Sequence, residues 1–226
     1  MRVELLDAVS RLKWAVYPFI VRLAPRLAIA VHEPKSAGAF WNAIENGMIV
    51  IDGGANLGGY AMLAAKRAAA RIYAFEPEPG NYAQLVRRVR GLRNVIPIQK
   101  ALGRRSGKAE LHLDRFHARH SLTRDGNRTI TVPVTSLDDF VREQSLPGVD
   151  VVKLDIEGAE LEAIAGMTGV LNAARRPVIL CELHPPLTPE QFCDALAVHG
   201  YRCEVLDAQF TGKVHDAPVH IMATPA

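Results

Sequence analysis

Short apolar runs alternate with longer amphipathic segments through most of the chain. The expected strands lie at 48–51, 71–75, 94–99, 149–155 and 177–181. The expected helices lie at 60–70, 79–90, 160–165 and 188–199, with a further capped helix at 135–144. This alternation predicts an α/β fold, in which a parallel sheet is joined by right-handed crossovers and has helices on both faces.

Two parts of the chain depart from this alternation. Residues 108–113 and 129–134 alternate apolar and polar positions, which predicts a small antiparallel pair. The polar and basic stretch 114–128 between them is expected to be either solvated surface or a cover over an active site that attracts an acidic substrate. The last two strands, 201–206 and 219–223, are separated by a turn-rich piece and are expected to form an antiparallel final pair.

Residues 1–46 are expected to form a helical appendage in front of a main domain at 47–226. The appendage contains an apolar run at 14–31 and an expected helix at 39–45. Two prolines and two arginines interrupt the apolar run, which argues against a membrane-spanning helix. The appendage is expected to act as a lid, a dimer contact or a packing segment, so a homodimer is a candidate assembly.

Composition limits the possible functions only a little. Of the 226 residues 49% are apolar, enough for a full core, and the net charge of +3 is too weak to indicate a nucleic-acid partner by itself. The three cysteines, Cys181, Cys193 and Cys203, lack metal-ligand spacing and are expected to be reduced thiols. Because acidic residues also occupy the place of a secretory signal, we expect a cytoplasmic protein.

Candidate chemistry begins where the first strand runs through a glycine turn into a helix. Such a turn can hold a nucleotide-like ligand, because glycine permits positive φ angles and close approach of the backbone. Ala55 stands where a dinucleotide-binding motif has its second glycine, and Asp52 precedes the turn as a carboxylate for a cationic amino-acid group. Both features favour S-adenosylmethionine over NAD. The predicted cofactor residues of this loop are Asp52, Gly53, Gly54, Ala55, Asn56 and Gly58.

A second acid, Glu76, stands at the end of the next strand, 24 residues after Asp52. In a strand–helix–strand unit, an acid at this place accepts hydrogen bonds from both ribose hydroxyls. Pro77 ends the strand and belongs to the same predicted cofactor site. Ala101 and Leu102 follow the third strand at the same edge of the sheet, where an adenine could rest.

Further polar residues fall near the carboxyl ends of the later strands, facing the reacting end of the cofactor. The predicted catalytic residues are Asp155, Glu157, Glu182 and His184. His184 or Asp155 could be the base that removes a proton from an acceptor hydroxyl. Alternatively, Asp155 and Glu182, with Glu157 as a further candidate, hold Mg²⁺, which acidifies a hydroxyl or orients a diol.

Three neighbouring charged residues are expected to have structural roles. Lys153 lies within a buried strand, so we expect it to form an ion pair with a neighbouring acid. Glu160 and Glu162 are expected on a solvated helix face or at the start of that helix, where a negative charge is favourable.

Four blocks of the sequence resemble the FkbM family of S-adenosylmethionine-dependent methyltransferases. They lie in the family's order and spacing within residues 47–200. The blocks are Val50–Gly59, Phe75–Pro79, Val152–Glu160 and Leu180–His184. The third block is the most specific, whereas the glycine turn alone indicates only a class I methyltransferase.

The resemblance implies a Rossmann-like class I methyltransferase fold, with a mostly parallel seven-stranded sheet and an antiparallel last strand. It implies O-methylation of a hydroxyl on a sugar or secondary metabolite, with S-adenosylmethionine as the methyl donor. By match of position, Asp52, Gly54 and Asn56 lie near the methionine end of the cofactor. Glu76 lies at the ribose, and Asp155 lies near the transferred methyl.

Three other functions stay open at this point. An RNA methyltransferase is favoured by the arginine cluster at 87–93 and by the basic stretch 114–128. The chain lacks an Asn-Pro-Pro-Tyr motif and an RNA-binding appendage, so a small-molecule or glycan acceptor is expected instead. Ala55 and the lack of a Tyr-x-x-x-Lys pair disfavour an NAD-dependent oxidoreductase. A protein that holds the cofactor without turnover is the remaining alternative.

Overall fold

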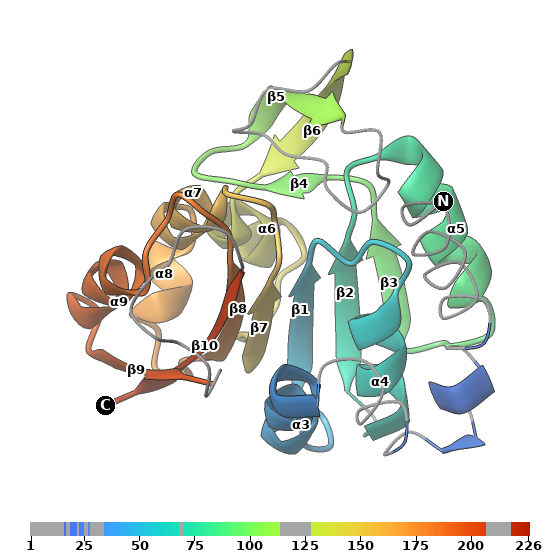
Figure 1. The fold of residues 1–226 in the computed structure, drawn as a ribbon, viewed down its shortest axis with the longest axis horizontal. Helices are drawn as coiled ribbons and strands as arrows, with labels where there is room; N and C mark the ends of the chain where they lie inside the picture. The colour runs from blue at the N-terminus through green and yellow to red at the C-terminus, as the bar shows by residue number, and fades with distance from the viewer. Residues whose placement is uncertain are drawn as a thin grey trace, which may run out of the picture.

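The protein is represented by a computed structural model, which describes residues 34–67, 70–113, 128–206 and 218–226, together with 16, 19–21, 23, 24 and 27. Its centre is a seven-stranded sheet (Figure 1). The strands of this sheet are β1 (Ile49–Gly53), β2 (Arg71–Phe75), β3 (Val95–Ile98), β7 (Val151–Leu154), β8 (Val178–Leu183), β9 (Tyr201–Val205) and β10 (Val219–Pro225). The helices are α3 (Pro34–Ala43), α4 (Gly59–Arg67), α5 (Pro79–Arg88), α6 (Leu137–Glu143), α7 (Glu160–Ala165), α8 (Thr168–Leu171) and α9 (Pro189–Ala197).

The strands of the large sheet follow the order β3-β2-β1-β7-β8-β10-β9. Strands β3, β2, β1, β7 and β8 are parallel, and β10 is antiparallel to both of its neighbours. The predicted sheet, mostly parallel with an antiparallel last strand, is therefore confirmed. The chain moves outward from β1 to β3 and then returns to the other side of β1 as β7. Ligands bind at the carboxyl ends of strands where the order of an open sheet reverses in this way.

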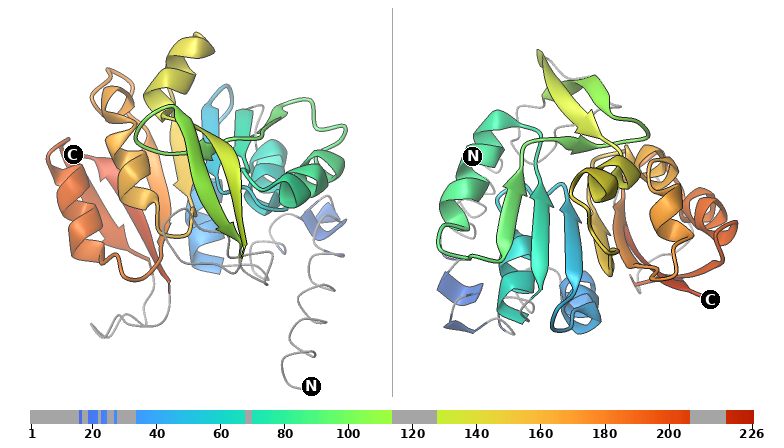
Figure 2. Two further views of the ribbon diagram at one scale, coloured as in Figure 1. Left: turned by 90° about the horizontal axis from the view of Figure 1, so that it is seen from above. Right: turned by 180° about the vertical axis from the view of Figure 1, so that it is seen from behind.

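Side chains that alternate along the strands build two separate cores. In β1, Ile51 shares a core with α6, α7, α8 and α9, whereas Val50 shares one with α3, α4 and α5. In β7, Val152 and Val151 divide in the same way. Figures 1 and 2 show the two helix groups on opposite faces of the sheet. The strands are continuous apolar runs because both of their faces are covered.

Helix α3 begins earlier than the sequence pattern predicts. The pattern predicts a loop up to Gly38, but the helix starts at Pro34. Proline suits the first turn of a helix, because its φ angle is preset and the N–H that it lacks would have no helical partner there. Phe40 is buried and packs edge-to-face on Tyr60, whose hydroxyl lies 3.0 Å from that of Ser36. These contacts join this part of the predicted appendage to the core of the sheet.

The predicted starts of two later helices are confirmed. In front of α6, the Ser136 hydroxyl accepts a hydrogen bond from the Asp139 N–H at 3.1 Å. In front of α9, Thr188 and Gln191 form a capping box, in which each side chain accepts from the other residue's backbone N–H. These bonds satisfy donors that the first turn of a helix leaves without a partner.

A second, smaller sheet lies beyond the carboxyl ends of β1, β2 and β3 (Figure 1). Its strands are β4 (Ala101–Leu102), β5 (Gly107–Leu113) and β6 (Arg128–Thr135), in the order β4-β6-β5. β5 and β6 are antiparallel, which confirms the predicted pair, and β4 pairs with β6 in parallel. The sheet has an apolar cluster of its own, formed by Ala101, Leu111, Val132 and Val134.

Several predictions fall outside the described part of the chain. They concern the helical appendage before residue 34, apart from seven scattered residues, the basic stretch 114–127 and the turn-rich piece 207–217. Across the described segments, no helix is long and apolar enough to cross a membrane. All three cysteines lie in these segments, and their thiols are free, as predicted.

Candidate functional site

A cavity opens at the carboxyl ends of β1, β2 and β7. The space between its lining residues, together with the open solvent at its mouth, is about 590 Å³. Of the predicted site residues, the following line it: Gly54, Asn56, Glu76, Pro77, Ala101, Leu102, Asp155 and Glu157. The lining residues that the sequence did not indicate are Phe75, Asn81, Lys100, Leu111 and Ile156.

The turn after β1 requires glycine at position 54. Gly54 has a φ of +73°, and a Cβ atom there would lie 1.8 Å from the carbonyl oxygen of Asp155. The turn therefore touches the backbone that follows β7, and no side chain fits between them. Asn56 also has a positive φ, and its N–H donates to Glu76 Oε2 at 2.8 Å. The turn and Glu76 thus form one connected side of the cavity.

Glu76 is held by backbone donors at both of its carboxylate oxygens. Oε2 accepts from the N–H of Asn56, and Oε1 accepts from the N–H of Glu78 at 2.9 Å. Burial raises the pKa of Glu76 to about 7, although these two hydrogen bonds lower it. Each oxygen retains further acceptor capacity, so the carboxylate can receive a pair of neighbouring hydroxyls such as those of a ribose.

Two acids that the sequence pattern places at strand ends lie inside strands. Asp52 is within β1, directly beside Lys153 of β7, and Glu182 is within β8, beside His220 of β10. Both strands continue past these acids because pairing with the neighbouring strand runs further. The directions of both side chains are therefore set by strand alternation rather than by a turn.

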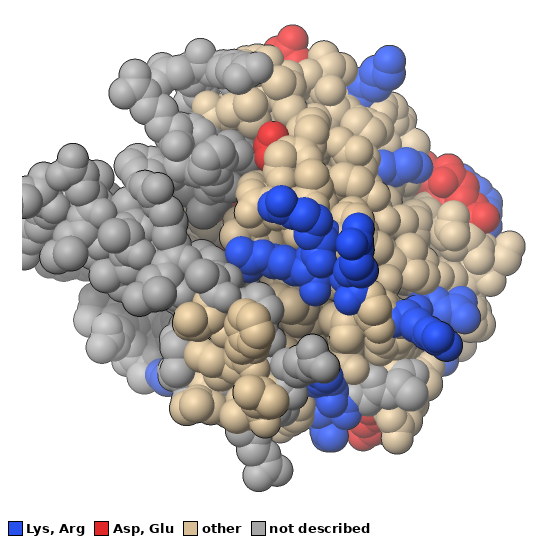
Figure 3. Space-filling model, turned by 90° about the vertical axis from the view of Figure 1, so that its right-hand side faces the viewer, with Lys and Arg blue, Asp and Glu red and all other residues tan. Residues whose placement is uncertain are grey.

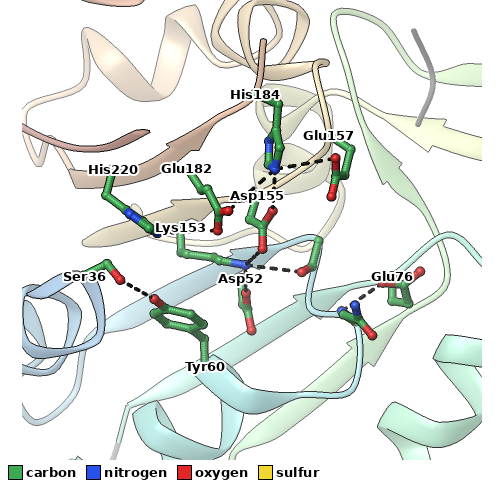
Figure 4. Close-up of polar contacts among 12 residues, drawn as sticks. Ser36, Asp52, Tyr60, Glu76, Lys153, Asp155, Glu157, Glu182, His184 and His220 are labelled. Atoms are coloured by element: carbon green, nitrogen blue, oxygen red, sulfur yellow. Dashed lines mark hydrogen bonds and ion pairs between the residues drawn. The ribbon is translucent and has the colours of Figure 1, made fainter. Parts of the chain in front are cut away.

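The carboxylate of Asp52 is fully buried and is directed at Lys153 rather than at the cavity (Figure 4). Its Oδ1 lies 3.5 Å from Lys153 Nζ. The same ammonium group lies 3.2 Å from Asp155 Oδ2 and 3.3 Å from the carbonyl oxygen of Gly54. It also lies over the ring of Tyr60, 4.9 Å from the ring centre. The predicted ion pair of Lys153 is confirmed, and this lysine links β1 to β7.

Burial and charge act against each other in this pair. Burial lowers the pKa of Lys153, but three neighbouring carboxylates raise it more, and the net pKa lies above its usual range. Burial raises the pKa of Asp52, while the charge of Lys153 lowers it. Because Lys153 faces several acids at once, we regard it as a permanent cation at neutral pH.

The other three residues predicted in the glycine loop, Gly53, Ala55 and Gly58, are packed closely against neighbouring elements. A Cβ atom on Gly53 would lie 2.9 Å from the Leu102 side chain, and one on Gly58 would lie 2.8 Å from the Leu85 side chain. Ala55 is buried, and its N–H donates to a backbone carbonyl of β2. These small residues allow the loop to close against β2, β4 and α5.

A second group of polar side chains gathers around His184, just after β8 (Figure 4). Its Nε2 atom lies 3.5 Å from a Glu157 oxygen, 3.7 Å from a Glu182 oxygen and 3.8 Å from an Asp155 oxygen. The four predicted catalytic residues therefore meet in one place. On the other side of the ring, Nδ1 lies 3.1 Å from Glu160 Oε1.

Of the two predictions for Glu160, the one that places it at the start of the helix is confirmed, and the one that places it on a solvated face is wrong. Its side chain is fully buried, and besides facing His184 it accepts a hydrogen bond from a backbone N–H of the preceding turn at 3.0 Å. Ala163 and Ile164 follow at helical spacing and are buried on the same side of α7. That spacing is the signal in the sequence that could have identified Glu160 as buried. Glu162, by contrast, is exposed as predicted.

His184 keeps its proton more tightly than an ordinary histidine. Burial lowers its pKa, but the hydrogen bond to Glu160 and the nearby carboxylates raise the pKa more. Glu157 lies beside the ring and has a φ of +53°, a backbone conformation that residues other than glycine rarely adopt. Such strained positions are frequent at functional sites.

The cluster around His184 suits either proton transfer or the binding of a cation. One ligand atom from each of Asp155, Glu157 and His184 lies within 4.8 Å of the other two. The predicted metal pair of Asp155 and Glu182 differs from this set. Glu182 directs one oxygen toward His184, but its other oxygen lies 3.5 Å from His220.

Lysines and arginines gather on the face of the molecule that carries α5 (Figure 3). Arg87 and Arg88 form the last turn of this helix, whereas the cavity residue Asn81 lies in its first turn. Arg87 follows Asn81 by six residues, which is about 9 Å along the helix axis. None of these arginines is among the residues that line the cavity.

The reversed last strand, the glycine turn after β1 and the cavity at the switch point define a Rossmann-like methyltransferase fold. Residues 52–203, more than half of the chain, match the sequence profile of the methyltransferase FkbM domain. The protein belongs to the FkbM methyltransferase family, so the resemblance in the sequence is confirmed.

Among curated proteins, the chain is similar to the hexuronic acid methyltransferase AglP of Haloferax volcanii. The two are 29% identical over 152 residues, which cover 66% of this chain and 61% of AglP. The chain thus spans about three fifths of the length of the curated relatives that it matches.

Two solved structures illustrate the shared fold. A precorrin-6y C5,15-methyltransferase from Geobacter metallireducens has a TM-score of 0.54 at 19% identity, covering 84% of this chain and 87% of that one. Fibrillarin from Aeropyrum pernix, in complex with S-adenosylmethionine, has a TM-score of 0.52 at 16% identity, covering 90% and 74%. At these identities, the likeness concerns the fold alone.

Proposed function

We propose that this protein transfers a methyl group from S-adenosylmethionine to a hydroxyl oxygen of a sugar or sugar acid. The observation that carries the proposal is one continuous cavity with Glu76 at one end and Asp155 with Glu157 at the other. The first end suits the nucleoside of a cofactor, and the second suits a reacting hydroxyl. The S-adenosylmethionine bound to fibrillarin, which has the same fold, supports this choice of cofactor.

In this proposal, each part of the cofactor has a place among the residues that line the cavity. The carboxylate of Glu76 accepts hydrogen bonds from the ribose hydroxyls. The adenine rests against Ala101 and Leu102, and the methionine part follows the turn at Gly54 and Asn56. Asp52 acts through Lys153 in this arrangement, because a direct contact with the cofactor would require it to leave its ion pair.

The reaction joins the acceptor oxygen to the methyl carbon. A lone pair of that oxygen forms the new bond, the methyl–sulfur bond breaks, and its electron pair remains on the sulfur. The hydroxyl proton passes to a base. Asp155 and Glu157 line the cavity, whereas the raised pKa of His184 favours a ring that is already protonated and so cannot take up a further proton. We therefore assign the base to this carboxylate pair, and to His184 the role of balancing its charge.

The likeness to AglP, whose name states a hexuronic acid as its substrate, supports a sugar acid as the acceptor. A sugar ring with neighbouring oxygen atoms also suits a site in which several carboxylates and a histidine converge. A purified preparation should therefore methylate hexuronic acids or their glycosides in preference to neutral hexoses, as measured by mass spectrometry of the products. Methylation of RNA but of no sugar would overturn the acceptor class.

Calorimetric titration tests the cofactor. S-adenosylmethionine and S-adenosylhomocysteine should bind at micromolar concentrations, and NADH should not bind. Glu76→Ala should weaken binding of S-adenosylhomocysteine by about 1–3 kcal/mol, the loss expected for hydrogen bonds to a charged acceptor. Glu110→Ala, at an exposed position of β5, is the matched control and should bind normally. Binding of NADH alone, or equal binding by both variants, would contradict the proposed cofactor site.

A further inference from the structure

On the Nε2 side of His184, the nearest carboxylate oxygens lie further away than a hydrogen bond reaches. The Nε2 atom is 3.5 Å from Glu157 Oε2 and 3.8 Å from Asp155 Oδ1. Hydrogen bonds between nitrogen and oxygen are about 2.7–3.2 Å long, so these atoms approach without bonding directly. Each of the three side chains offers one ligand atom within 4.8 Å of the others.

Separations of this order are found between ligand atoms that share a metal ion. Nitrogen and oxygen ligands lie about 2.1 Å from a divalent transition metal, and ligands at 90–120° to one another are then about 3.0–3.6 Å apart. The distance from Nε2 to Glu157 lies in this range, and the distance to Asp155 is slightly longer. We propose that Asp155, Glu157 and His184 form a binding site for a divalent transition-metal cation, of the Mn²⁺ or Zn²⁺ class, at the edge of the cofactor cavity. Small side-chain movements would bring all three atoms to bonding distance.

An independent observation supports His184 as a ligand. Its Nδ1 faces Glu160 Oε1 at 3.1 Å, and this carboxylate is itself fully buried and held by a backbone N–H. Metal-binding histidines commonly donate their other ring N–H to a carboxylate, which sets the orientation of the ring and the tautomer. When a cation displaces the proton from Nε2, the contact directs the lone pair of Nε2 toward Asp155 and Glu157.

The local charges also favour a cation. Four carboxylates face or border the ring of His184, namely Asp155, Glu157, Glu160 and Glu182. The ammonium group of Lys153 lies beside Asp155, but it is shared with Asp52 and so neutralises only part of this negative charge. His220 faces Glu182 from the neighbouring strand β10. A divalent cation at Nε2 would reduce the excess of negative charge in this buried place.

The donor set distinguishes between ions. Mg²⁺ prefers an octahedron of oxygen atoms and keeps several waters, whereas an imidazole nitrogen suits Mn²⁺, Co²⁺ or Zn²⁺. The proposed site therefore differs from the predicted Mg²⁺ pair of Asp155 and Glu182, because it includes an imidazole nitrogen and Glu157. Only Glu182 of that pair stays outside the three-ligand set.

The catalytic meaning of this site rests on the proposed function. Asp155 and Glu157 line the cavity, so a cation bound to them is open toward the acceptor. Two neighbouring oxygens of a sugar acid could complete its coordination. The cation would lower the pKa of the bound hydroxyl, so that a carboxylate oxygen of Asp155 or Glu157 that is not bound to the cation would suffice as the base for the methyl transfer described above.

Metal titration of the full chain, after dialysis against a chelator, tests the site without requiring turnover. We expect one equivalent of Mn²⁺ to bind, which is measured as the loss of the free Mn²⁺ signal in electron paramagnetic resonance. The affinity for Mg²⁺ should be weaker by about tenfold or more. Glu157→Gln should weaken Mn²⁺ binding by about 10- to 100-fold, and so should Glu160→Gln through the orientation of His184. Glu162→Gln, an exposed change in the same helical turn, is the control and should bind normally.

Three results would overturn the inference. These are no stoichiometric Mn²⁺ binding by the wild-type chain, equal affinity for Mg²⁺, or a Glu157→Gln variant that melts normally and binds Mn²⁺ as tightly as the control. A parallel titration with S-adenosylhomocysteine separates this inference from the proposed function. Cofactor binding without metal binding would reject the metal site alone, whereas metal binding without cofactor binding would reject the proposed function alone.

Discussion

The two ends of the cavity hold their acids in different ways. At the proposed cofactor end, Glu76 accepts hydrogen bonds from two backbone N–H groups, that of Asn56 in the turn after β1 and that of Glu78 in the loop after β2. At the proposed reaction end, Asp155, Glu157 and Glu182 converge on the titratable side chain of His184. Backbone donors cannot move or change charge, whereas side chains that face one another can rearrange. The position of the Glu76 carboxylate is therefore preset, and the reaction end can adjust its contacts to a cation or a substrate.

Gly54→Ala should have the largest effect, because Gly54 is where the two ends touch. The new methyl group would lie 1.8 Å from the Asp155 carbonyl oxygen, at a residue whose φ is +73°. We expect the free energy of unfolding, measured in urea, to fall by at least about 4 kcal/mol, or the protein not to fold. Gly47→Ala is the matched control, because φ is +79° there and no atom of the described residues lies within 4 Å of its Cβ. That change should cost about 1–2 kcal/mol, and equal losses would disprove a tight contact at Gly54.

Asp155→Asn should separate the two ends in function. The variant loses a carboxylate of the reaction end, so turnover should fall by about 100-fold or more. Its affinity for S-adenosylhomocysteine should change far less, because Glu76 and the glycine turn are untouched. Rate measurements and calorimetry on one preparation check both parts, with the exposed change Asp194→Asn as the control. A normal rate would remove Asp155 from the reaction, and a joint loss of binding would show that the two ends are not separable.

Lys153→Met tests the link between the strands that carry the two ends. The change leaves Asp52 buried without its cation, and removing one member of a buried pair costs about 3 kcal/mol or more. Thermal or urea unfolding would measure the loss. The double variant Lys153→Met with Asp52→Asn should regain part of it, because the unpaired charge is then gone. A double variant less stable than the single one would mean that Lys153 acts mainly through Asp155.

The smallest effect is expected from pH at the cofactor end. Glu76 has a pKa of about 7 in the free protein, and its ionised form is the better acceptor for ribose hydroxyls. The ionised fraction is therefore high above pH 7 and falls as the pH decreases through 7. Affinity for S-adenosylhomocysteine should drop about tenfold between pH 8 and pH 6. Glu76→Gln should bind more weakly at pH 8 but lose this pH dependence. If the dependence persists in that variant, another group causes it.

Much of the cofactor end could be predicted from short stretches of sequence. The apolar run of β1, the glycine turn and Glu76 after β2 each follow from local patterns, and the structure confirms the strands and brings Gly54, Asn56 and Glu76 to one cavity. The start of α3 at Pro34 was not predicted, because its contacts with Tyr60 come from a helix later in the chain. Local preference alone does not set the boundary of such a helix.

At the reaction end, the sequence by itself determined which residue types are present and that they lie near strand ends. Tertiary structure alone decided their partners. Asp52 faces Lys153 because β1 and β7 pair in one particular register, and a shift of one residue would turn either side chain to the opposite face. Glu160 reaches His184 because the buried side of α7 packs beside the end of β8. Partners contributed by separate strands and helices depend on register and packing, which no local pattern in the sequence encodes.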